Sequence, residues 1–209
     1  MRLFDLKGKV AVVTGGSKGI GRAICLAMAE HGAAVVVSSR KLDACEEVVK
    51  EIQAKGGKAK AIACNIGYRE QVDALVNGTR AAFGKIDIMV CNAAINPHAG
   101  PLSEITDALF DKVMASNVRS NLWLANLTIP EMAARKDGVV IIVSSIAGLR
   151  GAGSIGLYGI SKAADFQLGR QLATEWGPSN IRVNCIAPGR SEEHTSELQS
   201  LAYLVCRLL

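Results

Sequence analysis

The chain has 209 residues, of which 49% are hydrophobic and 21% are charged, and its formal net charge is +5. This length suits one domain with a sizeable core, and the apolar runs are too short to cross a bilayer. Lys and Arg are spread along the chain without a basic block or interleaved aromatic residues, so we expect neither a nucleic-acid partner nor a membrane partner.

The six cysteines are scattered, with no CxxC pair and no closely spaced histidine. This spacing is typical of reduced thiols and indicates neither a disulfide framework nor a metal site. The amino-terminal residues also lack the apolar stretch of a signal peptide. We therefore expect a cytoplasmic protein that holds no metal.

Short runs rich in β-branched residues alternate with longer amphipathic stretches. We expect strands at 10–14, 34–38, 60–64, 86–91, 139–144 and 181–186, and helices at about 19–31, 41–55, 68–83, 103–135 and 157–176. Glycines at 32, 56, 84, 138 and 177 stand where these helices should end. Most strand runs are apolar on both faces, which is typical of parallel strands covered by helices above and below. The order predicts an α/β fold, a Rossmann-type doubly wound parallel sheet with helices on both faces.

The alternation stops after the Pro-Gly pair at 188–189. Residues 190–200 read Arg-Ser-Glu-Glu-His-Thr-Ser-Glu-Leu-Gln-Ser, which is also the translation of the start of a common sequencing-library adapter. We therefore expect an incomplete dinucleotide-binding and catalytic domain at 1–189 and a non-native tail at 190–209. The alternative is a native amphipathic helix at the carboxyl terminus.

Residues 14–21 read Thr-Gly-Gly-Ser-Lys-Gly-Ile-Gly and join the first strand to the first helix. Gly15 permits a sharp turn, Gly19 lets the backbone approach a diphosphate, and Gly21 lets the helix pack closely on the sheet. The free N–H groups of the first helical turn can then bind the anion. The other residues that we expect at this site are Ser17, Lys18 and Ile20.

The same segment also fits the G-x-S-x-G elbow of an α/β hydrolase, with Ser17 as the nucleophile. A hydrolase would need an acid and then a histidine downstream. Before residue 190 the histidines are His31 and His98, and His31 lies one helix away on the wrong side of the turn. The pattern therefore favours the dinucleotide turn.

The second strand ends in Ser38-Ser39-Arg40-Lys41. A site that prefers NAD would place a carboxylate here for the ribose hydroxyls. Arg40, together with Lys18, instead favours a 2′-phosphate, so we expect Ser39 and Arg40 to contact NADP(H), preferred over NAD(H). The alternative is that Arg40 simply begins a solvated helix.

The second half of the chain carries polar residues that suit proton transfer. Ser145 ends the fifth strand, and Tyr158 and Lys162 stand four residues apart, so both side chains face the same way from one helix. An ammonium near a phenol favours the phenolate and makes the phenol a usable acid or base. Asn117 lies inside a helical pattern, where its amide needs a backbone or water partner. Asn92-Ala93-Ala94 follow the fourth strand, where a cofactor would lie.

Together these motifs resemble the short-chain dehydrogenase/reductase family of the compact, one-domain type. The resemblance covers 1–189 and rests on Thr14-Gly-x-x-x-Gly-x-Gly21, Asn92-Ala-Ala94, Asn117, Ser145, Tyr158-x-x-x-Lys162 and Pro188-Gly189. It implies that Tyr158 protonates a carbonyl oxygen that Ser145 polarises. It also implies that Lys162 holds the nicotinamide ribose and that Asn117 positions a relay water. The further cofactor contacts that it implies are Asn65, where the family usually has an aspartate, Ile66, Asn92, Ala93, Ala94, Tyr158, Pro188 and Gly189.

The implied function is that of an NADP(H)-dependent oxidoreductase acting on a ketone or secondary alcohol as a homotetramer or homodimer. Residues 38–45 are similar to the peroxisomal-type carbonyl and retinal reductases, followed by the 3-oxoacyl-carrier-protein reductases. The family's threonine-bearing loop, substrate lid and final strand are not recognisable after Gly189. The alternative is therefore a chain that binds the dinucleotide without catalysing a reaction.

Overall fold

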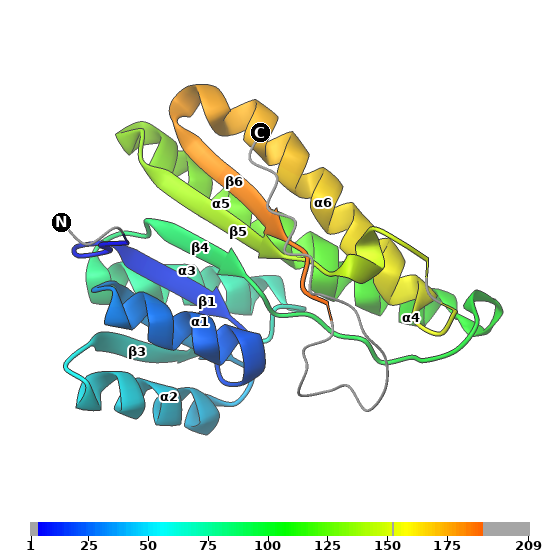
Figure 1. The fold of residues 1–209 in the computed structure, drawn as a ribbon, viewed down its shortest axis with the longest axis horizontal. Coiled ribbons are helices and arrows are strands. Elements are labelled where there is room, and N and C mark those ends of the chain that lie inside the picture. The colour runs from blue at the N-terminus through cyan, green and yellow to red at the C-terminus, as the bar shows by residue number, and fades with distance from the viewer. Residues whose placement is uncertain (1–3, 152, 190–209) are drawn as a thin grey trace.

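All strands in the described part of the chain run parallel and form one six-stranded sheet (Figure 1). The computed structural model describes residues 4–151 and 153–189, so the predicted tail at 190–209 lies outside the described residues. The strands are β1 (Val10–Thr14), β2 (Ala34–Ser39), β3 (Lys58–Ala63), β4 (Ile88–Cys91), β5 (Gly138–Val143) and β6 (Ile181–Ile186). Their order in the sheet, β3-β2-β1-β4-β5-β6, confirms the predicted doubly wound fold.

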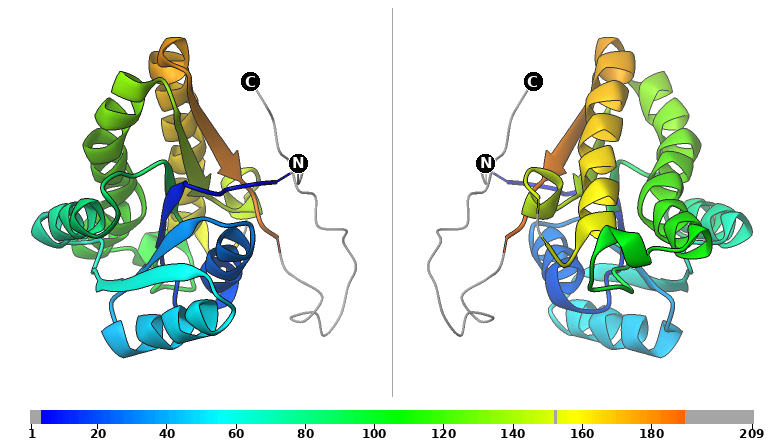
Figure 2. Two further views of the ribbon diagram at one scale, coloured as in Figure 1. Left: turned by 90° about the vertical axis from the view of Figure 1, so that its left-hand side faces the viewer. Right: turned by 90° about the vertical axis from the view of Figure 1, so that its right-hand side faces the viewer.

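Helices cover both faces of the sheet (Figure 2). One layer holds α1 (Gly19–Glu30) and α2 (Leu42–Ala54); the other holds α3 (Arg69–Phe83), α5 (Ser120–Arg135) and α6 (Gly156–Trp176). Neighbouring residues of β1 enter different cores, because Val12 packs on the α3–α5 side and Val13 on the α1–α2 side. Complete burial of one such side chain contributes about 1.5–3 kcal/mol, which explains why these strands are apolar on both faces.

The long helix predicted at 103–135 is divided in the structure. Leu102–Glu104 form a separate 3₁₀ turn, because Thr106 is extended and its hydroxyl caps α4 (Asp107–Met114) by accepting from Leu109 N. A π-helical turn at Ala115–Arg119 then joins α4 to α5. Such a turn adds one residue to the helical repeat and is often found at functional sites.

Gly138 does not end a helix, contrary to the prediction. The left-handed residue after α5 is Lys136, with φ of 53°. Gly138 instead begins β5, where an added Cβ would lie 2.4 Å from the Cβ of Met132. The strand predicted at 86–91 also begins later, at Ile88. Just before the strand, Asp87 still pairs through its backbone, since its N–H donates to Val10 O at 2.9 Å, and its carboxylate in addition accepts from Val10 N at 2.8 Å.

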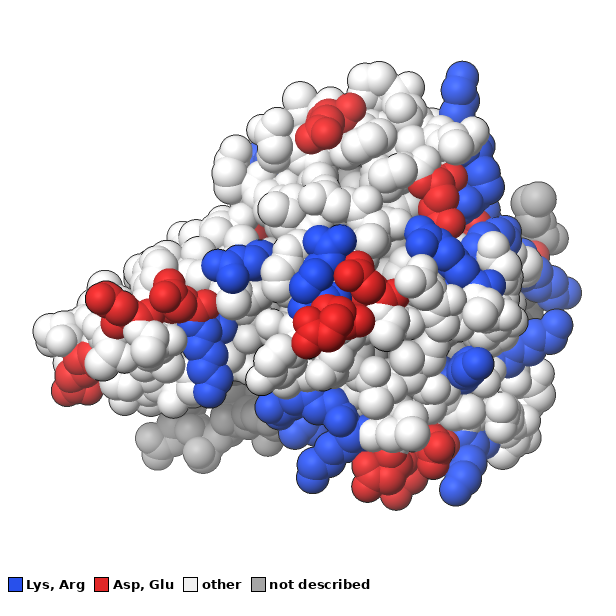
Figure 3. Space-filling model, turned by 180° about the vertical axis from the view of Figure 1, so that it is seen from behind, with Lys and Arg blue, Asp and Glu red and all other residues white. Residues whose placement is uncertain are grey.

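Charges of both signs are interspersed on the face of the molecule that Figure 3 shows. Several charged side chains of the described chain are paired, including Arg80 with Glu131 at 3.2 Å and Arg69 with Asp73 at 3.0 Å. A mixed surface of this kind creates no extended field of one sign. Among the helices of the described chain, none is long and apolar enough to cross a membrane.

Candidate active site

The carboxyl ends of the parallel strands bring the predicted residues to one edge of the sheet (Figure 1). The strand order reverses between β1 and β4, and ligands of doubly wound folds bind in the crevice at this point. The predicted residues at this edge are Gly15 after β1, Arg40 after β2, Asn65 after β3, Asn92 after β4, Ser145 after β5 and Pro188 after β6. Residues far apart in the sequence therefore lie at one edge of the sheet.

Thr14 and Asn92 lock the glycine turn to the neighbouring strand. The Thr14 hydroxyl donates to Val90 O at 3.2 Å and accepts from the backbone N–H groups of Asn92 and Ala93 at 3.0 and 3.1 Å. The Asn92 side-chain amide donates to Thr14 O at 2.9 Å and to Gly15 O at 3.2 Å. Asn92 thus fixes the shape of the turn as well as lying beside it.

The glycine turn fits a diphosphate group. Gly15 has φ of 65°, and a Cβ on Gly21 would lie 2.2 Å from Gly15 O, so helix α1 begins in direct contact with the turn. Lys18, at the amino end of α1, makes no side-chain capping bond, and the first helical turn contains no acidic residue. The free N–H groups of this turn are therefore available to an anion.

The end of β2 lies against the same turn, because Gly16 N donates to Ser38 O at 2.9 Å. Lys18 and Arg40 are each two residues from this contact and are both exposed. Neither side chain has a hydrogen bond or ion pair with another residue of the described chain. Ser39 is engaged locally: its hydroxyl donates to Lys41 O at 3.2 Å. This edge therefore offers two unpaired cations to a phosphate.

Asn65 and Ile66 follow β3 and differ in what they can contribute. Asn65 Oδ1 accepts from Gly67 N at 3.1 Å, which makes a local turn. Ile66 is 8% exposed and packs in the core with Val72 and Leu75. Ile66 thus supports the loop from below, and Asn65 is the more exposed of the two.

Lys162 lies beneath Tyr158 on helix α6. Its Nζ is 5.8 Å from the centroid of the Tyr158 ring and donates to Val143 O at 2.8 Å and to the Asp165 carboxylate at 2.9 Å. The Ser144 hydroxyl donates to Lys162 O at 2.7 Å. These bonds tie α6, the helix that carries Tyr158, to the end of β5, which Ser145 follows.

Ser145 begins a short 3₁₀ turn, Ile146–Gly148, that rests on α6. Its hydroxyl accepts from Ala147 N at 3.1 Å, and Ile146 N donates to Pro188 O at 3.0 Å, which brings 188–189 beside the site. A Cβ on Gly148 would lie 2.6 Å from the backbone carbon of Lys162. The turn and the helix therefore touch through their backbones.

We expect Gly148→Ala to destabilise the protein by about 1–3 kcal/mol, because the backbone of α6 cannot move away from the added methyl group. Denaturant unfolding measures the effect. Gly151→Ala is the matched control, since Gly151 has no atom within 4 Å of an added Cβ. Equal free energies of unfolding for the two variants would show that the contact tolerates a side chain.

Asn117 lies in the π-helical turn and is fully buried. Its Oδ1 accepts from Ile95 N at 2.8 Å, and its Nδ2 donates to Ile95 O at 2.9 Å and to the Ser161 hydroxyl at 3.0 Å. These partners explain why an amide is stable within a helix. Asn117 joins the loop after β4 to α6.

Three buried residues of this network escaped the sequence analysis: Ser161, Asn121 and Asp165. Asn121 Nδ2 donates to Asn117 O at 2.7 Å and to Asp165 Oδ1 at 2.9 Å. The spacings were visible, because Asn121 follows Asn117 by four residues and Asp165 follows Lys162 by three. The sequence did not indicate that the two helices meet.

Burial governs the ionisation of the groups around Lys162. Desolvation raises the pKa of Asp165, and the Lys162 ammonium and the Asn121 hydrogen bond oppose this rise. Burial also raises the pKa of Cys91, and it raises that of Cys185 to about 11. Both thiols are therefore uncharged at neutral pH, and the close ionisable pair of this region is Lys162 with Asp165.

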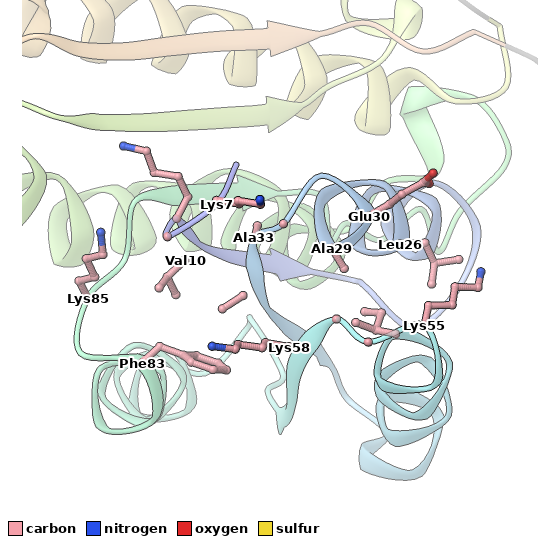
Figure 4. Close-up of a pocket in the computed structure, with 17 residues that line it drawn as sticks. Lys7, Val10, Leu26, Ala29, Glu30, Ala33, Lys55, Lys58, Phe83 and Lys85 are labelled. Atoms are coloured by element: carbon pink, nitrogen blue, oxygen red, sulfur yellow. The ribbon is translucent and has the colours of Figure 1, made fainter. Parts of the chain in front are cut away.

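A depression of about 660 Å³ lies at the opposite, amino-terminal edge of the sheet (Figure 4). Five lysines line it, of which Lys9 pairs with Asp137, Lys55 with Glu51 and Lys85 with Asp87. None of the predicted site residues lines it. The carboxyl edge of the sheet, where the predicted residues lie, is therefore the candidate site.

Comparisons with known proteins agree with this geometry. The family model for short chain dehydrogenases matches residues 9–200. Dehydrogenase/reductase SDR family member 4 of Rattus norvegicus is 40% identical over 197 residues, which cover 94% of this chain and 71% of that protein. A metagenomic short-chain oxidoreductase in complex with NADP has a TM-score of 0.84 at 36% identity and covers 88% of this chain and 84% of its own.

A second solved structure is that of a 7α-hydroxysteroid dehydrogenase complexed with NADH and 7-oxo glycochenodeoxycholic acid. Its TM-score is 0.85 at 39% identity, and the match covers 89% of this chain and 72% of that one. The family match extends over most of the chain and includes every strand of the sheet. The chain therefore belongs to the short-chain dehydrogenase/reductase family, whose members are oxidoreductases that use a nicotinamide dinucleotide.

Proposed function

We propose that this chain is an NADP(H)-dependent oxidoreductase that interconverts a ketone and a secondary alcohol, with Tyr158 as the acid and base. The observation that carries the proposal is the buried Lys162 Nζ, 5.8 Å from the centre of the Tyr158 ring and bonded to the end of β5. The nicotinamide, when bound, supplies or accepts the hydride. The glycine turn and the Lys162 ammonium are the groups that would hold it.

The protein's own residues would handle the proton. The Ser145 hydroxyl accepts from Ala147 N, so its own hydrogen is available to polarise a carbonyl oxygen. The Tyr158 hydroxyl would donate its proton to that oxygen, and the Lys162 ammonium would stabilise the phenolate that remains. Asn117 would position a water, since its bonds to Ile95 and Ser161 fix the floor of the site.

Two cations beside the glycine turn, both without a partner among residues 4–151 and 153–189, support a preference for NADP(H). A carboxylate at the end of β2 would instead favour the ribose hydroxyls of NAD, and this chain has Ser39 and Arg40 there. Similar solved structures hold either NADP or NADH. Arg40 and Lys18 therefore carry this part of the proposal.

We expect Arg40→Asp to weaken NADPH binding by about 2 kcal/mol, which is the loss of one charge-assisted hydrogen bond. NADH binding should change much less, because NADH lacks the 2′-phosphate. Titration of nucleotide fluorescence measures both affinities. Lys50→Asp, at an exposed position of α2, is the control for the change in net charge. Equal losses for NADPH and NADH in Arg40→Asp would contradict the assignment.

The substrate class is tested by oxidation of NADPH with three kinds of ketone: an aromatic diketone, a 3-oxoacyl thioester and an oxosteroid. Turnover of the diketone would support the resemblance of 38–45 to carbonyl reductases. Turnover of the thioester would favour the 3-oxoacyl-carrier-protein reductases instead. Tight NADPH binding without oxidation by any of the three would favour a chain that binds the dinucleotide without catalysis.

A further inference from the structure

A buried ion pair supports the proposed catalytic lysine. Lys162 is 2% exposed and Asp165 is fully buried, and Lys162 Nζ lies 2.9 Å from Asp165 Oδ2. The other carboxylate oxygen accepts from Asn121 Nδ2 at 2.9 Å. Removing two charges from water costs free energy, and the attraction between the two charges does not always recover that cost. A neutral acceptor such as Val143 O would be enough to hold Lys162 in place. The presence of an ionisable carboxyl group at Asp165 therefore indicates a role beyond holding the side chain.

The groups that face this pair are mostly neutral. Cys91 of β4 and Cys185 of β6 are thiols whose pKa values burial raises. β5 contributes the carbonyl of Val143, and α5 contributes the amide of Asn121. The ionisable side chains of α4 and the π-helical turn point to solvent: Asp107, Asp111, Lys112 and Arg119 are exposed. The Asp165 carboxylate is thus the anion that contacts Lys162 within the described chain.

Two opposing effects act on the charge of a buried lysine. Burial away from water disfavours the ammonium, and a fully buried lysine can titrate several pH units below its usual range. A carboxylate in direct contact acts in the opposite direction and preserves the charge. The carboxylate also fixes geometry: Val143 O and Asp165 Oδ2 take two of the three N–H directions of Lys162, which leaves one for a ligand.

We propose that Asp165 is a positioning residue that keeps the buried Lys162 protonated and directed at Tyr158, and thereby sets the pH range in which Tyr158 exchanges a proton. This inference rests on the proposed function, in which Tyr158 is the acid and base. Asn121 supports Asp165, because its Nδ2 donates to both Asp165 Oδ1 and Asn117 O and so joins α6 to α5.

Asp165 acts on Tyr158 in two opposite ways. Its negative charge directly disfavours a phenolate, whereas the ammonium that it preserves favours one. Along the helix, Lys162 is four residues from Tyr158 and Asp165 is seven, which corresponds to about 6 Å and about 10 Å of rise. Lys162 Nζ is 5.8 Å from the centre of the Tyr158 ring, and Asp165 follows almost one turn later, so we expect the effect through Lys162 to exceed the direct effect.

The test is a spectrophotometric pH titration of tyrosinate in the 209-residue chain without cofactor or substrate. Subtracting the curve of Tyr158→Phe isolates Tyr158 from the other tyrosines. In Asp165→Asn, which keeps the shape and removes the charge, we expect the Tyr158 midpoint to move to higher pH by about one unit or more. An unchanged midpoint, or a lower one, would overturn the proposal.

Thr128→Val is the matched control for a loss of buried polarity. Thr128 is fully buried, and its hydroxyl donates to Leu124 O within α5, away from Lys162. This variant should lose stability and leave the Tyr158 midpoint unchanged. A shift of equal size in both variants would mean that Asp165 acts only through general stability.

A second measurement needs no variant of Asp165 and covers the case in which Asp165→Asn does not fold. Nitrogen-15 NMR of the side-chain amines, with the Lys162 signal assigned by its absence in Lys162→Arg, reports the charge of Lys162. The proposal requires an ammonium at neutral pH in the parent chain. A neutral amine there would overturn it.

The two hypotheses fail separately. Both measurements are made without ligands, so the absence of any reductase turnover would refute the proposed function and leave these results interpretable. Full turnover with an unchanged Tyr158 midpoint in Asp165→Asn would refute the role of Asp165 alone.

Discussion

Tyr158→Phe is expected to reduce turnover by about 10²–10⁴-fold, the contribution typical of a positioned general acid. The substitution removes one hydroxyl and keeps the ring beneath which Lys162 lies. NADPH affinity and the free energy of unfolding should therefore stay close to those of the parent chain. Steady-state oxidation of NADPH with the best ketone, and fluorescence titration of NADPH, measure the two effects separately.

Tyr68→Phe is the control for the loss of a phenol. Tyr68 is 53% exposed at the amino end of α3, so this variant should keep full turnover. Retained turnover in Tyr158→Phe would contradict the acid–base assignment. A large loss of NADPH affinity in that variant would indicate instead that the hydroxyl mainly binds cofactor.

The elements that the sequence predicted well depend on local chemistry. The apolar run of β1 and the glycine turn after it can be recognised from adjacent residues alone, and the first strand was placed correctly at 10–14. The pair at 158 and 162 follows from the helical repeat, which puts residues four apart on one face. In both cases the signal lies within about a dozen residues, and contacts with distant segments are not needed to recognise it.

The features that the sequence missed depend on contacts between distant segments. Asn121 and Asp165 are 44 residues apart and meet only because α5 and α6 pack side by side. The interruption of the helix predicted at 103–135 also involves a contact with a distant segment. Asn117 lies in the π-helical turn, and its amide bonds to Ile95 in the loop after β4. No periodicity in the sequence reports such a contact.

Gly138 shows a related limit. A glycine at the end of a helical pattern usually caps the helix, and the sequence offered no reason to expect otherwise. The structure uses it for space, because Met132 on the last turn of α5 lies where a Cβ would project. The left-handed turn is made by Lys136 instead. Conformational and steric reasons for a glycine look identical in a single sequence.

Gly21→Ala is the second substitution for which we expect a large effect, and here helix propensity and packing predict opposite signs. Alanine in a helix is favoured over glycine by about 0.8–1.0 kcal/mol. At this position, however, the added Cβ would lie 2.2 Å from Gly15 O and 2.6 Å from Asn92 Nδ2. The carbonyl belongs to the backbone of the cofactor turn, and Asn92 holds that turn with two hydrogen bonds.

Neither neighbour can move without opening the turn, so packing should outweigh propensity, and we expect a net loss of about 1–3 kcal/mol or more. NADPH affinity should fall with it, because the same turn would bind the diphosphate. Gly78→Ala is the matched control: Gly78 is also helical, and its added Cβ would meet only the flexible end of Ile62 at 3.1 Å. Denaturant unfolding should therefore show Gly78→Ala as stable as the parent or more stable, and Gly21→Ala less stable. If both variants gained stability and bound NADPH normally, the turn would have room for a side chain, and its role as a tight diphosphate cradle would be wrong.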